Sequence, residues 1–272
     1  MKEFITKDIL YRKVDSLTLR ATIYLPEQAE PIPFVVDVHG GAWGGGDRFN
    51  NQVIHRSFAK NGIGVFAIDF RLSSQAPFPH PIADANYGVR WFKKYASTLG
   101  IKPSLIGGFG SSSGAQQIGL VALQPDKKLY CEEHPDLREV DAKLDFFIGA
   151  WPILDPLARY QMAKTTGKDR LIQAHHSYFP NAEDMTTGNP YLVVSSETAT
   201  HMPQMAIIQG VEDENVDHFR ADMFAELYCK MGGIIQVHKF SGQPHAFVTS
   251  NPSHPDSLEA IEKLQDFIFS LT

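Results

Sequence analysis

Three consecutive serines enclosed by glycines are the first residues in this sequence that could carry out chemistry. Residues 110–114 read Gly-Ser-Ser-Ser-Gly and fit the pattern G-x-S-x-G, in which Ser112 has glycine two positions before and two positions after. An apolar run at 105–109 precedes the motif and a helix-like stretch at 115–123 follows it, as this nucleophile motif requires. We therefore predict that Ser112 is a nucleophile, with its two serine neighbours as alternatives. The backbone N–H of Ser113 would then donate to the oxyanion.

A glycine-rich stretch upstream could supply further donors to a negatively charged oxygen. It reads His-Gly-Gly-Ala-Trp at residues 39–43 and continues through three more glycines, directly after an apolar run at 33–38. Glycine leaves backbone N–H groups free to face a ligand, and acyl transfer needs such donors about 3 Å from the oxyanion. A phosphate loop is the competing interpretation, but neither G-K-[S/T] nor G-x-G-x-x-G is present in this stretch. We expect His39 to brace the loop.

Together these two motifs resemble the α/β-hydrolase superfamily, and within it the hormone-sensitive-lipase-like and bacterial feruloyl/acetyl esterase group. The resemblance covers roughly residues 35–247 and has further matches at residues 67–72, 76–79 and 84. It implies that the N–H groups of Gly41, Ala42 and Ser113 form an oxyanion hole. The group commonly has a third glycine where Ala42 stands, but alanine retains the N–H that donates.

The acid and the base of such a site are expected to follow late strands, in the order serine, acid, histidine. The family pattern of glycine, two residues, aspartate, two residues, valine places the acid at Asp213, with Glu212, Glu214 and Asp217 as rivals. His245 follows the expected strand at 234–240, where the base should lie. It would take the proton of the serine and return it to the leaving alcohol.

These residues need a scaffold, and the rest of the sequence predicts one. Strand-like runs alternate with helical stretches, which indicates an α/β fold with a mostly parallel central sheet and helices on both faces. An antiparallel pair is expected at one edge of the sheet, and residues 1–272 are expected to form a single α/β-hydrolase domain. Asp69 and Arg71 are expected to form a buried structural pair. The predicted strands lie at residues 8–13, 17–25, 33–38, 64–70, 104–109, 144–150, 205–209 and 234–240, and a helix is expected at 216–231.

The alternation is interrupted once, between residues 151 and 203. We interpret this segment as a cap inserted over the carboxyl edge of the sheet, and a peripheral excursion without a role is the alternative. Aromatic residues in and near it are predicted to line a substrate pocket, although plain core packing would also explain them. The predicted pocket residues are Trp43, Trp151, Tyr178, Phe179 and Phe247.

Composition excludes several other classes of function. The formal net charge of −6 argues against a nucleic-acid partner. No apolar run is long enough to span a membrane, and no signal-peptide pattern is seen at the N-terminus, so a cytoplasmic protein is expected. The two cysteines have no metal-ligand spacing, and adjacent histidines such as His175 and His176 point apart on regular structure. We expect neither a metal nor a cofactor.

The predicted function is that of a serine hydrolase that cleaves short-chain acyl or aryl carboxylic esters through an acyl-enzyme. Its partner would be a small-molecule ester, and the resemblance also allows a homodimer. An amidase resembling kynurenine formamidase is the alternative, since that enzyme also carries a His-Gly-Gly-x-Trp loop. A dipeptidyl-type peptidase would usually have an added propeller domain. A non-catalytic binding protein on the same scaffold would be expected to have lost a member of the Ser112, Asp213 and His245 set.

Overall fold

An eight-stranded sheet forms the centre of the computed structural model, which describes residues 2–27, 31–132 and 134–272. Its strand order is β1-β2-β4-β3-β5-β6-β7-β8. The β1–β2 and β2–β4 pairs are antiparallel, and all the other neighbouring strands run parallel. This arrangement confirms the predicted mostly parallel sheet. The strands are β1 (Phe4–Val14), β2 (Leu17–Pro26), β3 (Ile32–Val38), β4 (Gly64–Ile68), β5 (Pro103–Ser111), β6 (Phe146–Ala150), β7 (Gln204–Gly210) and β8 (Ile235–Phe240).

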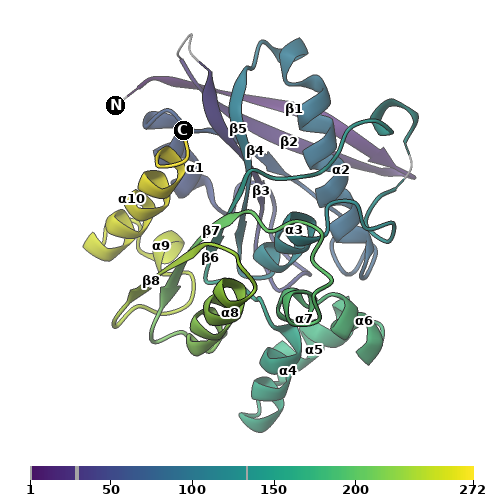
Figure 1. Ribbon diagram of the computed structural model, residues 1–272, viewed down its shortest axis with the longest axis vertical. Helices are drawn as coiled ribbons and strands as arrows, with labels where there is room; N and C mark the ends of the chain where they lie inside the picture. The colour runs from purple at the N-terminus through teal and green to yellow at the C-terminus, as the bar shows by residue number, and fades with distance from the viewer. Residues whose placement is uncertain (1, 28–30, 133) are drawn as a thin grey trace.

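Helices cover both faces of the sheet, as predicted. One apolar core lies under α2, α3 and α8, and a second core lies under α1, α9 and α10 on the opposite face; the two groups lie on opposite sides of the strands in Figure 1. Strands β3, β4 and β6 are buried along their whole length because both of their faces are covered. The helices on the two faces are α1 (Gln52–Lys60), α2 (His80–Tyr95), α3 (Ser113–Leu123), α8 (Phe219–Lys230), α9 (Phe247–Ser250) and α10 (Pro255–Phe269), and short 3₁₀ turns lie at Ser97–Leu99 and Pro135–Leu137.

Four further helices occupy the segment between β6 and β7, where the sequence lacks strand periodicity. Asp155, Asn181 and Asn189 cap three of them with side-chain oxygens, and prolines follow two of these caps, which are typical helix-start signals. The α4 and α5 helices pack against each other and, with α6, lie at one end of the molecule (Figure 1). The four helices are α4 (Pro156–Thr165), α5 (Asp169–Tyr178), α6 (Ala182–Thr187) and α7 (Pro190–Ser195).

A buried ionic cluster connects the edge of the sheet to α2. Asp84 is fully buried and accepts hydrogen bonds from the backbone N, Nε and Nη2 of Arg71, each at 2.8 Å, and from Arg12. Glu132 pairs with both arginines on the outer side of the cluster. The expected pair of Asp69 and Arg71 is therefore wrong, because Asp69 pairs instead with Arg48 at 2.8 Å.

Replacing Asp84 with asparagine is expected to lower the free energy of unfolding by about 3–5 kcal/mol, because the two buried arginines lose the fully buried carboxylate between them and keep only the partly exposed Glu132 as a charge partner. Chemical denaturation followed by circular dichroism measures this loss. The matched control is Asp141→Asn, which breaks an ion pair with Lys93 in which the aspartate side chain is 64% exposed. That change is expected to cost at most about 1 kcal/mol, and equal losses for the two variants would contradict this reading of the cluster.

Candidate active site

Ser112 lies on a sharp turn between the end of β5 and the start of α3. Its backbone has φ 50° and ψ −119°, a sparsely populated conformation for a residue with a side chain. The two flanking glycines make the turn possible. A Cβ atom on Gly114 would lie 1.9 Å from the carbonyl oxygen of Val38, and one on Gly110 would lie 2.5 Å from the Cα of Ala115. The spacing of the G-x-S-x-G motif therefore follows from two close backbone contacts.

The backbone of Ser112 is fixed against the end of β6. Its N–H donates to the carbonyl oxygen of Ala150 at 2.9 Å, and its own carbonyl accepts from the N–H of Ile153 at 3.1 Å. The side chain points to His245, whose Nε2 lies 3.0 Å from Ser112 Oγ. This is hydrogen-bonding distance between a hydroxyl and the nitrogen that could take its proton.

The other ring nitrogen of His245 contacts a buried carboxylate. Nδ1 of His245 lies 2.7 Å from Asp213 Oδ2, which also accepts from Nε2 of Gln209 at 2.9 Å. Asp213 Oδ1 accepts from the N–H groups of Asn215 and Val216 at 2.8 and 2.9 Å. Burial raises the pKa of Asp213, but the hydrogen bond and the charge interaction with His245 outweigh burial, so the pKa lies below its usual value. The carboxylate is therefore ionised at neutral pH.

The glycine-rich loop after β3 lies beside Ser112. Gly41 has φ 127°, and a Cβ atom there would lie 2.0 Å from the carbonyl oxygen of Gly45. In the part of the chain that the structure describes, the N–H groups of Gly41 and Ala42 have no hydrogen-bond acceptor. The N–H of Ser113, at the first position of α3, is among those without an acceptor inside the helix. His39 stacks on Phe70 with ring centroids 4.3 Å apart, as its expected bracing role requires.

Two serines considered only as alternative nucleophiles hold this loop in place. Ser111 Oγ accepts from the N–H of Gly40 at 3.0 Å, and Ser113 Oγ accepts from the N–H of Trp43 at 3.1 Å. Sequence reasoning missed this role, because the hydroxyls pair with backbone groups about seventy residues earlier in the chain. Within the described structure His245 forms a hydrogen bond with the hydroxyl of Ser112 and with neither of these two.

For the ester hydrolysis predicted from the sequence, replacing Ser113 with alanine is expected to lower kcat about tenfold with little change in KM. The substitution leaves the buried N–H of Trp43 unpaired and frees the adjacent peptide groups to move; losing one oxyanion donor outright costs about 10²- to 10³-fold. Steady-state kinetics on a p-nitrophenyl ester measures the effect. The control is Ser195→Ala, which removes an exposed serine hydroxyl bonded to its own helix. A loss that appears only in KM would argue against a donor-positioning role.

A cavity of about 480 Å³ opens at Ser112 and His245. Most of its wall is small or polar, and Trp151 is the predicted aromatic residue that lines it. Helices α4 and α5 contribute to the wall, as does the turn after Asp213. Sequence reasoning missed the polar residues of the wall because no local pattern singles them out. The polar side chains missed are Asn50, Asn51, Arg159, Arg170, Asn215 and Thr249.

The other four predicted pocket residues lie in the core instead of in the cavity wall. Each is at most 2% exposed. Trp43 stacks on Tyr178 with centroids 4.9 Å apart and contacts Phe179, and its Nε1 donates to Gln116 at 2.9 Å. Phe247 packs against Trp151 on the other face of the sheet. Trp43, Tyr178 and Phe179 join the glycine loop to the inserted helices, and Phe247 belongs to the core on the opposite face, so the alternative of core packing describes all four.

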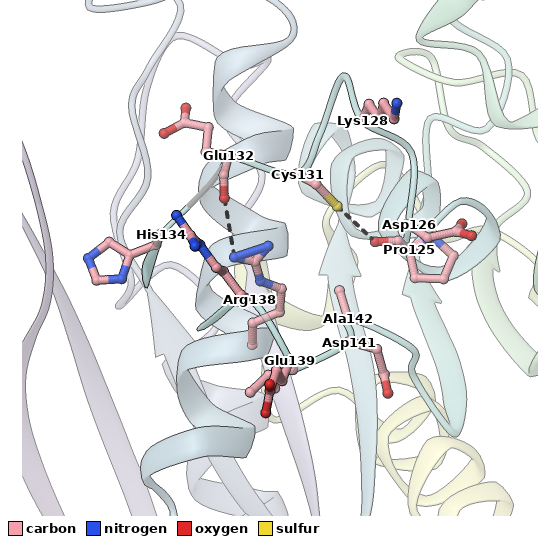
Figure 2. Close-up of a pocket in the computed structure, with 12 residues that line it drawn as sticks. Pro125, Asp126, Lys128, Cys131, Glu132, His134, Arg138, Glu139, Asp141 and Ala142 are labelled. Carbon is pink, nitrogen blue, oxygen red and sulfur yellow. Dashed lines mark hydrogen bonds between the residues drawn. The ribbon is translucent and has the colours of Figure 1, made fainter. Parts of the chain in front are cut away.

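A larger cavity of about 910 Å³ lies between α2 and the segment that leads to β6 (Figure 2). Its wall mixes acidic and basic side chains with Cys131, whose Sγ lies 3.3 Å from the carbonyl oxygen of Pro125. None of the described residues lines both this cavity and the one at Ser112. Among the described residues no cluster of side chains could hold a metal ion, and no helix is long and apolar enough to cross a membrane.

Comparison with known proteins shows the family to which this chain belongs. The family model BD-FAE matches residues 21–228, which is most of the chain. The chain belongs to the BD-FAE family. This membership agrees with the esterase group that the sequence resembles.

Curated relatives of this BD-FAE chain include a probable isoprenylcysteine alpha-carbonyl methylesterase from Oryza sativa subsp. japonica, 22% identical over 84% of this chain and 55% of that protein. The carboxylesterase NlhH of Mycobacterium tuberculosis is 32% identical over 40% of this chain and 35% of that protein. The chain therefore spans only about a third to a half of the length of these relatives.

Solved structures similar to this BD-FAE chain include esterase 2 of Thermogutta terrifontis with propionate bound. It has a TM-score of 0.78 and 23% identity, and the match covers 98% of this chain and 94% of that one. The same esterase phosphorylated by paraoxon gives a TM-score of 0.78, 22% identity and the same coverage. At these identities the likeness shows the fold, which is the α/β-hydrolase fold expected from the sequence.

Proposed function

We propose that this protein hydrolyses carboxylic esters, with Ser112 as nucleophile, His245 as general base and Asp213 as the acid that orients it. One observation carries the proposal: the continuous hydrogen-bonded chain from Ser112 Oγ through both ring nitrogens of His245 to a buried, ionised Asp213. This arrangement is the one in which a serine hydroxyl is activated for attack on a carbonyl.

The residues act in a fixed order in the proposed reaction. His245 Nε2 takes the proton of Ser112 as Oγ attacks the ester carbonyl, and Asp213 keeps the second proton of the ring on Nδ1. The negative charge that develops on the carbonyl oxygen would face the N–H groups of Gly41, Ala42 and Ser113. His245 then returns its proton to the leaving alcohol, and a water molecule activated in the same way releases the acid from Ser112.

The cavity supports a small ester as substrate. A volume of about 480 Å³ is at the lower end of the range of small-molecule sites. Side chains of α4 and α5 form part of its wall, which supports the proposal that residues 151–203 act as a cap. Trp151 is the one predicted aromatic residue in the wall, and it is largely buried against Phe247.

The relatives favour an ester over an amide as the bond that is cleaved, because their names describe esterases and methylesterases. A direct test measures kcat/KM for p-nitrophenyl acetate, p-nitrophenyl butyrate and N-formylkynurenine. We expect hydrolysis of both esters, and a much lower kcat/KM for the formamide. No ester hydrolysis would contradict the proposal, and a preference for N-formylkynurenine would support the formamidase instead.

A further inference from the structure

Two arginines give the cavity at Ser112 an unusual charge. Arg159 of α4 and Arg170 of α5 both line it, and no aspartate or glutamate is found among the described residues of its wall. Arg170 is exposed and forms no ion pair within the described chain. Cavities with walls of one sign concentrate ligands of the opposite sign. The cavity is therefore better suited to an anionic substrate than to a neutral one.

Arg159 is a buried cation that has no carboxylate partner among the described residues. The residue is 3% exposed. Nε donates to the backbone oxygen of Asn215 at 3.0 Å, and Nη2 donates to the side-chain oxygen of the same residue. Nη1 is buried and has no hydrogen-bond partner among the described residues. A polar group in this state costs free energy unless a ligand offsets it.

The nearby acidic groups do not remove this positive charge. Asp213 interacts with Arg159 through space, but both of its oxygens are already bonded to His245 and to its own loop. Burial lowers the pKa of Arg159 to about 10, so the group remains charged at neutral pH. Asp155 caps α4 and contacts Arg220 at 3.6 Å.

A second groove adjoins the cavity at Ser112 and shares Arg170 and His245 with it, but its wall carries a different balance of charge. Three acidic residues and Lys168 line it together with Arg170, so the positive excess is confined to the inner cavity. Counted together with the buried Asp213, which lies outside the described wall but interacts with Arg159, the two arginines leave an excess of one positive charge, which matches a monoanion. The acidic residues of the groove are Asp169, Glu212 and Glu214.

We propose that the esters cleaved at this site carry a carboxylate group, which the positive charge of Arg159 and Arg170 attracts and holds. This inference rests on the proposed function and adds the class of substrate to it. The proposal covers a carboxylate on the acyl part or on the alcohol part of the ester, because Ser112 and both arginines line the same cavity.

Matched pairs of esters test the proposal and separate the two orientations. The first pair is 4-acetoxybenzoate and its methyl ester, which differ by a negative charge on the leaving group. The second is mono-(4-nitrophenyl) adipate and 4-nitrophenyl hexanoate, which differ by a negative charge on the acyl group. We expect kcat/KM to be at least about tenfold higher for the charged member of one pair, as hydrogen bonds to charged groups allow. Equal or lower values in both pairs would overturn the proposal while leaving ester hydrolysis intact.

Substitution of the arginines identifies the source of the preference. The readout is the ratio of kcat/KM for the charged ester to that for the neutral one, because a general loss of activity cancels in it. Arg159→Gln is expected to lower this ratio about tenfold or more, and Arg170→Gln to lower it less, since an exposed charge is screened. Arg56→Gln, an exposed arginine on α1, is the control. An unchanged ratio in both cavity variants would contradict the proposal.

A binding experiment keeps the inference separate from the proposed mechanism. Calorimetry with the Ser112→Ala variant, which has no nucleophile, measures the Kd of 4-acetoxybenzoate and of its methyl ester without turnover. The charged compound is expected to bind about tenfold more tightly, and less so in high salt. Equal affinity would overturn the carboxylate site. Failure of the wild type to cleave any ester, with the binding preference present, would overturn the proposed function alone.

Discussion

Replacing Ser112 with alanine is expected to lower kcat for p-nitrophenyl acetate by about 10⁴- to 10⁶-fold. The variant loses the one hydroxyl that His245 contacts at 3.0 Å, so no acyl-enzyme can form. A small rate above that of water is expected to remain, because the donors near Gly41 and Ala42 would still polarise a bound carbonyl. Stopped-time product assays at high enzyme concentration measure this range.

Stability provides the internal control for this experiment. Serine and alanine both carry a Cβ atom, so the backbone strain at φ 50° is the same in the variant. The thermal unfolding midpoint is therefore expected to change little. Ser111→Ala, at the neighbouring position, removes a hydroxyl that accepts from Gly40 and is expected to lower kcat far less. If Ser111→Ala and Ser112→Ala lost activity equally, the assignment of the nucleophile would be wrong.

Replacing Asp213 with asparagine is expected to lower kcat by about 10⁴-fold, a value typical of the acid in such a set. The carboxylate oxygens accept four hydrogen bonds. An asparagine amide has one accepting oxygen, so its NH₂ group would face a donor. The ring of His245 would then prefer the tautomer with the proton on Nε2, which cannot take the proton of Ser112. Steady-state kinetics measures the loss, and Glu214→Gln, an exposed neighbour, is the control.

The same substitution carries a pH signature in stability. The pKa of Asp213 is held below its usual value. Its contribution to the free energy of unfolding is therefore complete above the unfolded pKa of about 3.9 and is lost as the pH falls through the lower folded pKa. The wild type should be more stable than Asp213→Asn at pH 7, and the difference should shrink below about pH 4. A difference that stays constant down to acidic pH would contradict the charge interaction.

The parts of the site that the sequence predicts are those determined by local backbone geometry. The glycines around Ser112 are required by contacts within one turn, and the loop at Gly41 needs a residue without Cβ, so both motifs can be read directly. Local pattern separates Asp213 less sharply, because three other acids lie within four residues of it. The predicted helix at 216–231 begins only at Phe219, because the N–H groups ahead of it bind Asp213 instead.

The parts that the sequence does not predict depend on packing between distant elements. Trp43 is buried by Tyr178 of an inserted helix, and no local pattern separates such a ring from a pocket wall. Arg159 reaches the cavity through the packing of α4 and its bonds to Asn215. Strand β4 ends at Ile68, two residues before its predicted end, and Arg71 then turns to Asp84 on α2. The partners of long charged side chains depend on which groups lie nearby in the folded structure. Spacing in the sequence does not show this.

Covalent labelling with a p-nitrophenyl phosphonate ester tests the central claim most directly. A serine activated by a hydrogen-bonded histidine base attacks phosphorus and keeps the adduct, since the tetrahedral product resembles the transition state of acyl transfer. Peptide mapping by mass spectrometry is predicted to find one phosphonyl group per chain, on Ser112, with loss of ester hydrolysis in proportion to labelling. A stable adduct on any other residue, or full activity after labelling of Ser112, would contradict the account.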